Sequence, residues 1–373
     1  MVESFRPVRE EEIERMISSI SHLSSLSEPV NLAKLLTLFT NNVISRVAFG
    51  KIFHSEGSTD QKNGFHNLLM KSEAMFSAFF ARDYFAWAGW VDVLSGQRAR
   101  LGKTYTELDA FYRKVIAEHE DPMRTEEKED IVDVLLRLQK EDNHLTQDQV
   151  KGVLMNLLLA GTHTTSRTLE YAMAELMRNP SVMLKAQEEV RRVVGDKGKV
   201  DESDISQLNY LKLVMKETLR LHPVLPFLIP REAMGHVKIN EYDVFPKTRV
   251  YVNAWSIGRD PDSWDQPDEF IPERFVGSAI DFRGLNFQFL PFGAGRRICP
   301  GMSFTIITME LALANLLYIF NWDLSDDMMK EGIDMDEIFG VAVHLKTNLR
   351  LQATKHAPHL RGALSAPETK VDY

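Results

Sequence analysis

The stretch PFGAGRRICPG, residues 291–301, holds the only cysteine of this 373-residue chain. Its glycines and prolines favour a tight loop with few side chains, in which backbone N–H groups can turn toward Cys299. Pro300 directly precedes an apolar run with helical spacing, residues 302–320, which places Cys299 near a helix N-terminus. The dipole and free amides there favour a negative sulfur without a cationic side chain. We therefore predict a metal-ligating thiolate; the alternative is a buried structural cysteine.

The loop matches a pattern with five fixed positions. The pattern is Phe-x-x-Gly-x-Arg-x-Cys-x-Gly, and its fixed positions are Phe292, Gly295, Arg297, Cys299 and Gly301. Such a long motif rarely arises by accident, and here the chain resembles the cytochrome P450 family of haem-thiolate monooxygenases, most closely the plant microsomal members. The resemblance implies that Cys299 is the axial thiolate ligand of heme b and that Arg297 pairs with a haem propionate. An axial thiolate donates electron density to iron and favours O–O cleavage.

The composition indicates a globular protein, because 44% hydrophobic residues are enough to build a substantial core. One cysteine excludes an intrachain disulfide, and the net charge of -9 argues against nucleic acid as a main partner. The highly charged first residues do not resemble a signal peptide. No stretch is expected to span a membrane; the best candidate, residues 308–320, contains Glu310 and is interpreted as a core helix.

Hydrophobic periodicity predicts a mainly α chain with a minor β part, organised as a single domain over residues 1–373. The longest predicted helix runs from a capping box at Thr146 and Gln149 to about Arg178, where Asn179-Pro180 ends it. Further helices are expected at residues 8–23, 29–49, 63–81, 96–120, 130–140, 180–194 and 205–221, and short strands at residues 236–239, 249–252, 341–344 and 349–353.

The resemblance also concerns the beginning of the chain. Microsomal members of the family start with a membrane anchor, whereas this sequence opens on a charged segment, residues 3–12, that follows the third main helix in those members. We therefore expect a cytochrome P450 fold that lacks its first helices and its membrane anchor. By resemblance, the location is the cytosolic face of the endoplasmic reticulum membrane, and a membrane surface is a partner of the full-length relative. A chain without the anchor can be soluble.

Two short motifs predict a buried triad of charges. Glu217 and Arg220 lie three residues apart on a predicted helix, so their side chains share a face. Alone this signal is weak, because exposed pairs contribute about 0–1 kcal/mol. The segment PERF, residues 272–275, lies between this helix and the cysteine loop as it does in the family, and the resemblance implies that Arg274 joins the pair. The expected role is structural, because losing one member would leave an uncompensated buried charge.

Within the longest predicted helix, the sequence AGTHTT at residues 160–165 resembles the family's oxygen-activation motif. By resemblance, Gly161 lets the helix open over the haem and the Thr164 hydroxyl hydrogen-bonds dioxygen. The alternative for Thr164 is a bond to the carbonyl of the preceding turn. His163 departs from the family, which usually has a carboxylate there that helps to deliver protons. Histidine also moves protons near neutral pH; it can instead donate to a backbone carbonyl or ligate the iron from the distal side.

Arg231 stands where the family places a cation for a haem propionate, so that it and Arg297 would supply two guanidinium groups suited to carboxylates. The resemblance places substrate walls at residues 157–161, 224–229 and 339–343. These walls are almost wholly apolar, which suits a lipophilic substrate and excludes water; the same residues can also be plain core. The substrate-pocket candidates are Leu157, Ala160, Val224, Leu228, Ile229 and Val341.

The leading hypothesis is a haem-dependent monooxygenase that inserts one oxygen atom from O2 into a lipophilic small molecule of the plant secondary-metabolite type. By resemblance, electrons come from NADPH through NADPH-cytochrome P450 reductase. Two alternatives stay open: an inactive truncated homologue, and a protein that binds haem without catalysis, for which His163 would be the distal ligand.

Overall fold

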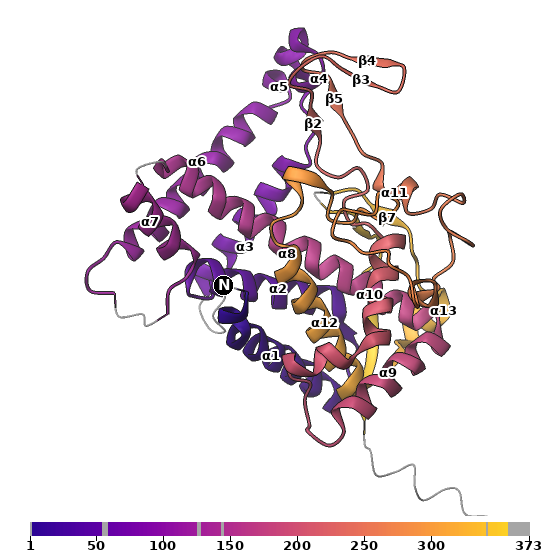
Figure 1. Cartoon of the computed structure of the whole chain (residues 1–373). Coiled ribbons are helices and arrows are strands. Elements are labelled where there is room, and N and C mark those ends of the chain that lie inside the picture. The colour runs from indigo at the N-terminus through magenta and orange to yellow at the C-terminus, as the bar shows by residue number, and fades with distance from the viewer. Residues whose placement is uncertain (1, 54–58, 125–127, 143–144, 341, 357–373) are drawn as a thin grey trace, which may run out of the picture.

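The computed structural model describes residues 2–53, 59–124, 128–142, 145–340 and 342–356 (Figure 1). The predicted class, mainly α with a minor β part, is confirmed. The longer helices are α1 (Arg6–Ser25), α2 (Leu32–Phe49), α3 (Thr59–Phe76), α6 (Gln97–His119), α7 (Ile131–Asp142), α8 (Gln147–Arg178), α9 (Pro180–Val194), α10 (Asn209–Leu221) and α12 (Met302–Ile319). Short helices are α4 (Ala81–Tyr84), α5 (Gly89–Leu94), α11 (Ala254–Ile257) and α13 (Asp326–Glu331).

The strands are short and antiparallel. They are β1 (Val30–Asn31), β2 (Arg231–Glu232), β3 (Val237–Ile239), β4 (Tyr242–Val244), β5 (Arg249–Val250), β6 (Phe320–Leu324), β7 (Glu337–Ile338), β8 (His344–Leu345) and β9 (Arg350–Lys355). Three of them form a sheet in the order β1-β9-β6, and the others form the pairs β2-β5, β3-β4 and β7-β8.

The long helix α8 begins at the predicted capping box. The Thr146 N–H donates to Gln149 Oε1 (2.8 Å), and the Gln149 N–H donates to Thr146 Oγ1 (3.2 Å). This reciprocal pair satisfies amides that a helix start would otherwise leave unpaired. The helix then runs without interruption to Arg178, and Pro180 begins α9. These predicted bounds are confirmed.

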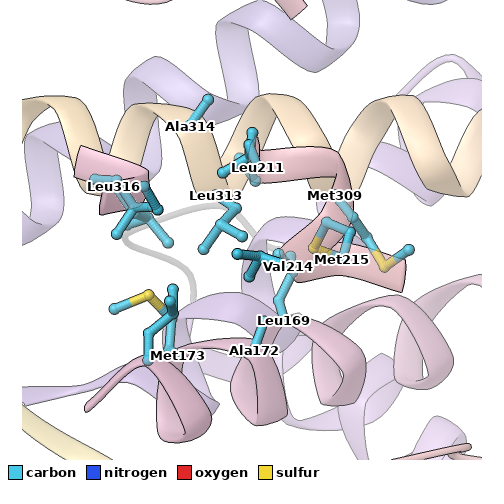
Figure 2. Packing of buried hydrophobic residues seen from close by; sticks show 14 of the residues in the cluster. Leu169, Ala172, Met173, Leu211, Val214, Met215, Met309, Leu313, Ala314 and Leu316 are labelled. Atoms are coloured by element: carbon cyan, nitrogen blue, oxygen red, sulfur yellow. The ribbon is translucent and has the colours of Figure 1, made fainter. Parts of the chain in front are cut away.

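The larger hydrophobic cluster surrounds α12, most of whose side chains are apolar. Figure 2 shows side chains of α8, α10 and α12 meeting there, among them Leu169, Val214 and Leu313, which are fully buried. Burying a side chain of this size contributes about 1.5–3 kcal/mol. The smaller cluster joins the first half of α8 to the end of α2 and to α3, α6 and α7. Because α8 contributes to both clusters, it sets the position of one relative to the other.

Helix α12 begins at Met302, where the predicted apolar run begins. By length and composition it is the one helix in the described part of the chain that is long and apolar enough to cross a membrane. The expectation that no stretch meets this test was therefore wrong. However, 61% of that helix is buried inside the protein, so its interpretation as a core helix is confirmed.

Two boundaries differ from prediction because of contacts between distant residues. The predicted helix 29–49 starts as strand β1, since Val30 pairs with Leu351 of β9; Asn31 then caps α2 by accepting the Lys34 N–H (3.0 Å). The last residue of the predicted helix 302–320, Phe320, instead begins β6.

The predicted helix 205–221 is two helices. A short 3-10 helix, η3 (Glu202–Gln207), has its own capping box between Asp201 and Asp204. A new helix, α10, then begins, and the Glu189 carboxylate of α9 accepts its Tyr210 and Leu211 N–H groups at 2.8 and 3.0 Å. The cap for α10 thus comes from another helix, which explains why local sequence did not reveal the break.

Candidate functional site

Backbone hydrogen bonds hold the cysteine loop in a tight turn in front of α12. The Cys299 N–H donates to the Phe292 carbonyl (2.9 Å), and the Ile298 N–H donates to the Gly295 carbonyl (3.1 Å). Gly293 and Gly295 have φ values of 72° and 70°, a region that side-chain-bearing residues rarely adopt. The glycines therefore allow the turn that brings the cysteine to the end of the loop.

The Cys299 thiol lies half-buried three residues before α12. Burial raises the pKa of this thiol, whereas the Gly301 and Met302 N–H groups directed at the sulfur lower it. The effect of burial is the larger, so the pKa lies above its ordinary value. The predicted amides are therefore present, and they lower the pKa of the thiol by less than burial raises it. A metal ion deprotonates a coordinating thiol outright, so a bound metal would complete this site.

The loop contains the guanidinium group of Arg297, and Arg231 lies beside it. Arg231, at the start of β2, donates from Nη2 to the Arg297 carbonyl (3.3 Å). The same Nη2 lies 3.9 Å from the position that a Cβ would occupy at Gly293. Neither Arg231 nor Arg297 forms a salt bridge with a carboxylate among the residues that the structure describes. Two cations without such partners can bind a ligand with two carboxylates.

The structure brings the predicted triad together. Arg220 contacts Glu217 in a bidentate pair, Nη2–Oε1 at 2.7 Å and Nε–Oε2 at 2.8 Å, and Arg274 Nε lies 2.9 Å from the same Oε1. The side chains of Glu217 and Arg220 are fully buried, and that of Arg274 is 9% exposed. The arginines also donate to the carbonyls of Pro267 and Asp265 (2.7 and 2.6 Å). The triad thus fixes the irregular segment before the cysteine loop to α10.

One face of α8 is left partly open. Leu157, Ala160 and Thr164, at helical spacing, are all incompletely buried. The Thr164 hydroxyl donates to the Ala160 carbonyl (2.6 Å), which is the bond to the preceding turn that the sequence analysis gave as the alternative. To hydrogen-bond a ligand as a donor, Thr164 must release this carbonyl.

Gly161 lies where α8 and α2 approach each other closely. A Cβ built at Gly161 would be 2.6 Å from Ile44 Cδ1, and the Thr40 hydroxyl of α2 donates to the Thr162 carbonyl (2.8 Å). The helix is regular at this point. Gly161 thus has a packing role, because it lets α2 and α8 come into contact; the interpretation that it lets the helix open over a haem stays a prediction.

His163 is buried, with 6% of its surface exposed, and its Nε2 lies 3.4 Å from Glu73 Oε2 of α3. A carboxylate is thus close to this position, but it comes from another helix instead of from α8. Sequence reasoning missed Glu73, because no local pattern links α3 to α8.

Two of the three predicted substrate walls meet directly. The Val343 N–H donates to the Val224 carbonyl (2.9 Å). The Cδ1 atom of Leu228 lies 3.8 Å from the position that a Cβ would occupy at Gly293, so the wall 224–229 borders the cysteine loop. Ile229 is exposed, at 61% of its surface. Val341 lies outside the described residues.

The comparisons with known proteins show the family. The family model for cytochrome P450 matches residues 1–349. The chain belongs to the cytochrome P450 family.

Curated plant P450s are similar over most of the chain. Cytochrome P450 71A1 of Persea americana is 51% identical over 95% of this chain and 72% of the relative. The 6,7,8-trihydroxycoumarin synthase of Pastinaca sativa is 46% identical over 95% and 71%, and strychnine-11-hydroxylase of Strychnos nux-vomica is 45% identical over 95% and 70%. This P450 is therefore an oxidoreductase of the monooxygenase type with relatives in plant secondary metabolism.

Solved P450 structures share the fold. A zebra fish cytochrome P450 structure with abiraterone has a TM-score of 0.78 at 26% identity, and the match covers 95% of this chain and 78% of that chain. A second zebra fish structure, with progesterone, has the same TM-score at 27% identity. The expected cytochrome P450 fold is confirmed.

Haem fits the residues present in this P450. Cys299 offers one sulfur ligand at the end of a loop whose glycines keep large side chains away. Arg231 and Arg297 offer two cations for the two propionates of the porphyrin.

Proposed function

We propose that this P450 is a haem-thiolate monooxygenase whose iron ligand is Cys299. The observation that carries the proposal is the half-buried Cys299 thiol, which faces two backbone amides in a loop that contains Arg297 and lies beside Arg231. When bound, heme b with an axial thiolate supplies dioxygen chemistry and the cleavage of the O–O bond. Cys299 would hold the iron, and the two arginines would bind the propionates and orient the ring.

Helix α8 would supply polar groups of the reaction from two of its faces. Thr164 would offer its hydroxyl proton at Oγ1 after exchanging its bond to Ala160 for one to the ligand. His163 lies next to it in sequence and contacts Glu73, whose side chain is 17% exposed. This contact joins a buried imidazole to a partly exposed carboxylate, so His163 and Glu73 would hold protons for the site. Gly161 would keep the helix in place through its contact with Ile44.

The substrate is a lipophilic small molecule. Apolar side chains from three segments, among them Leu157, Val224 and Leu228, would line the pocket and exclude water. Two similar plant P450s carry the names of a coumarin synthase and a strychnine hydroxylase, which supports a substrate of the plant secondary-metabolite type.

We infer that electrons reach the site from NADPH through NADPH-cytochrome P450 reductase, and that the protein acts at the cytosolic face of the endoplasmic reticulum membrane. Both inferences rest on the plant P450s to which the chain is similar.

The test is the carbon monoxide difference spectrum of the reduced, haem-reconstituted chain. The expected result is the long-wavelength Soret band of thiolate ligation, followed by turnover of apolar probe compounds with the reductase. Cys299→Ser should abolish this band. Arg296→Gln, in the same loop but at a position that the motif leaves variable, serves as a control that keeps it. A band of the imidazole type in the unsubstituted chain would overturn the ligand assignment and favour a haem-binding protein without turnover.

A further inference from the structure

A polar network at the second half of α8 is not used by the proposed chemistry. Three α8 residues, Glu170, Tyr171 and Glu175, are almost fully buried and contact segments that come much later in the chain. The Glu170 carboxylate accepts the Leu349 N–H (3.3 Å) just before β9. The Tyr171 hydroxyl donates to Glu337 Oε1 of β7 (3.0 Å). Buried polar groups of this kind are costly unless paired, so the contacts fix these segments to α8.

His222 joins the same network. Its Nε2 lies 2.8 Å from Glu175 Oε1, and its Nδ1 lies 4.0 Å from Glu337 Oε1. Its ring stacks on that of Tyr171, with a centroid distance of 4.6 Å and an interplanar angle of 7°. The imidazole therefore lies between two carboxylates that belong to two different elements, α8 and β7.

The electrostatics agree with this arrangement. Burial alone would raise the pKa of Glu175, but His222 and then Arg178 more than offset that, and the pKa is lowered. The pKa of Glu337 is also lowered, first by His222, against burial. Both carboxylates are thus held in the charged form that accepts hydrogen bonds most strongly.

The network is placed between two substrate walls. Glu337 lies two residues before the wall 339–343, and His222 lies two residues before the wall 224–229. The walls are joined to each other by the Val343 N–H and the Val224 carbonyl (2.9 Å). The third wall, 157–161, is part of α8 itself. The network therefore joins the segments that directly precede two predicted walls to the helix that carries the third.

We propose that Tyr171 and Glu337, with His222 and Glu175, are positioning residues that hold the β7–β8 segment against α8 and so determine which orientation of a bound small molecule the pocket accepts. The residues do not touch the reacting atoms. The effect on substrate orientation rests on the proposed function, because it requires a pocket that binds a substrate.

The variants are Tyr171→Phe, Glu337→Leu and Glu337→Gln. The first two remove the donor or the acceptor of the Tyr171–Glu337 bond, and glutamine keeps an oxygen that accepts it. Tyr210→Phe is the matched control, because it removes an equivalent bond elsewhere, from the Tyr210 hydroxyl to Glu273 Oε1 (2.9 Å).

The first readout is hydrogen exchange of the full chain, with and without haem. Losing a bond to a charged acceptor should speed amide exchange in β7 and β8 about tenfold in Tyr171→Phe and Glu337→Leu. Glu337→Gln should exchange at a rate between those of the unsubstituted chain and Glu337→Leu, because it retains an acceptor but loses the charge. Tyr210→Phe should leave β7 and β8 unchanged.

The second readout uses azole probes, whose ring nitrogen binds haem iron while the substituent meets the pocket walls. The ratio of the Kd values of 1-phenylimidazole and 4-phenylimidazole should change about threefold or more in Tyr171→Phe and Glu337→Leu, since a shifted wall favours one isomer. The Kd of unsubstituted imidazole and the carbon monoxide spectrum should stay the same.

Unchanged exchange in β7 and β8 would overturn the inference. Faster exchange together with a phenylimidazole Kd ratio equal to that of Tyr210→Phe would also overturn it. The network would then have a structural role only. If the unsubstituted chain binds no haem, the proposed function fails, and the exchange rates alone decide whether Tyr171 and Glu337 hold β7.

Discussion

Gly161 of α8 lies so close to Ile44 of α2 that a Cβ at position 161 would be 2.6 Å from Ile44 Cδ1 and 2.8 Å from Cγ1. Ile44 is branched at Cβ, so its Cγ1 has little freedom to move away. The two helices therefore depend on a glycine at this position to pack at their present distance.

Gly161→Ala should destabilise the protein by about 1–2 kcal/mol, because overpacking costs more than the better helix propensity of alanine returns. Urea unfolding measures the change. Gly152→Ala is the matched control on the same helix; nothing lies within 4 Å of its built Cβ, so it should stabilise by up to about 1 kcal/mol. The double variant with Gly161→Ala and Ile44→Ala should relieve the clash. If the losses of folding free energy of the two single variants simply add in the double variant, the packing role is contradicted.

Glu217→Ala should cost about 3–5 kcal/mol of folding free energy, because the buried Arg220 guanidinium would lose its carboxylate. Denaturant unfolding and the yield of soluble protein are the measurements. The partly exposed pair of Arg6 and Glu10 (2.7 Å) provides the comparison, and Glu10→Ala should cost less than about 1 kcal/mol. Equal effects of the two substitutions would show that burial of the triad does not determine its contribution.

Glu310 of α12 should make stability fall as pH rises. Burial raises the pKa of this carboxyl to about 7, above its ordinary value of 4.5. The folded state therefore binds the proton more tightly, so the stabilisation is complete below pH 4.5 and is lost as pH rises through about 7. The loss is at most about 3 kcal/mol, since each pKa unit corresponds to about 1.4 kcal/mol.

Glu310→Gln should remove this part of the pH dependence. The pH dependence is measured from the urea midpoints of unfolding at pH values below and above the titration of Glu310. Above it, the variant should be more stable than the unsubstituted chain. If the stability of the variant depends on pH in the same way as that of the unsubstituted chain, then Glu310 ionises without a cost in folding free energy.

Arg297→Gln should speed haem loss about ten- to hundredfold, because a charge-assisted hydrogen bond contributes about 1.5–3 kcal/mol. Transfer of haem to an apoglobin acceptor gives the rate. Arg296→Gln is the control, since Arg296 is an exposed neighbour that lies outside the five-position motif. Similar rates for the two variants would mean that only the general positive charge of the loop acts on the haem.

Local signals explain what the sequence predicted well. The capping box at Thr146, the proline that begins α9 and the apolar run of α12 each act within a few residues, and their elements appear with nearly the expected bounds. The tight loop around Cys299 follows from its own glycines in the same way.

Contacts between helices explain what the sequence did not predict. The break before α10 depends on Glu189 of another helix, and the need for glycine at position 161 depends on Ile44 of α2. The partner of His163 is Glu73, ninety residues earlier in the chain. Neither periodicity nor a short motif records which side chain faces another across a helix interface.

Helix α8 belongs to two hydrophobic clusters, and this has a consequence for how such a protein can evolve. The larger cluster supports the triad segment and α12, while the smaller one is built from α3, α6, α7 and the ends of α2 and α8. Mutations confined to the smaller cluster can reshape the outer helices while the cysteine loop keeps its support. Natural selection can thus diversify one part of the molecule and preserve the other.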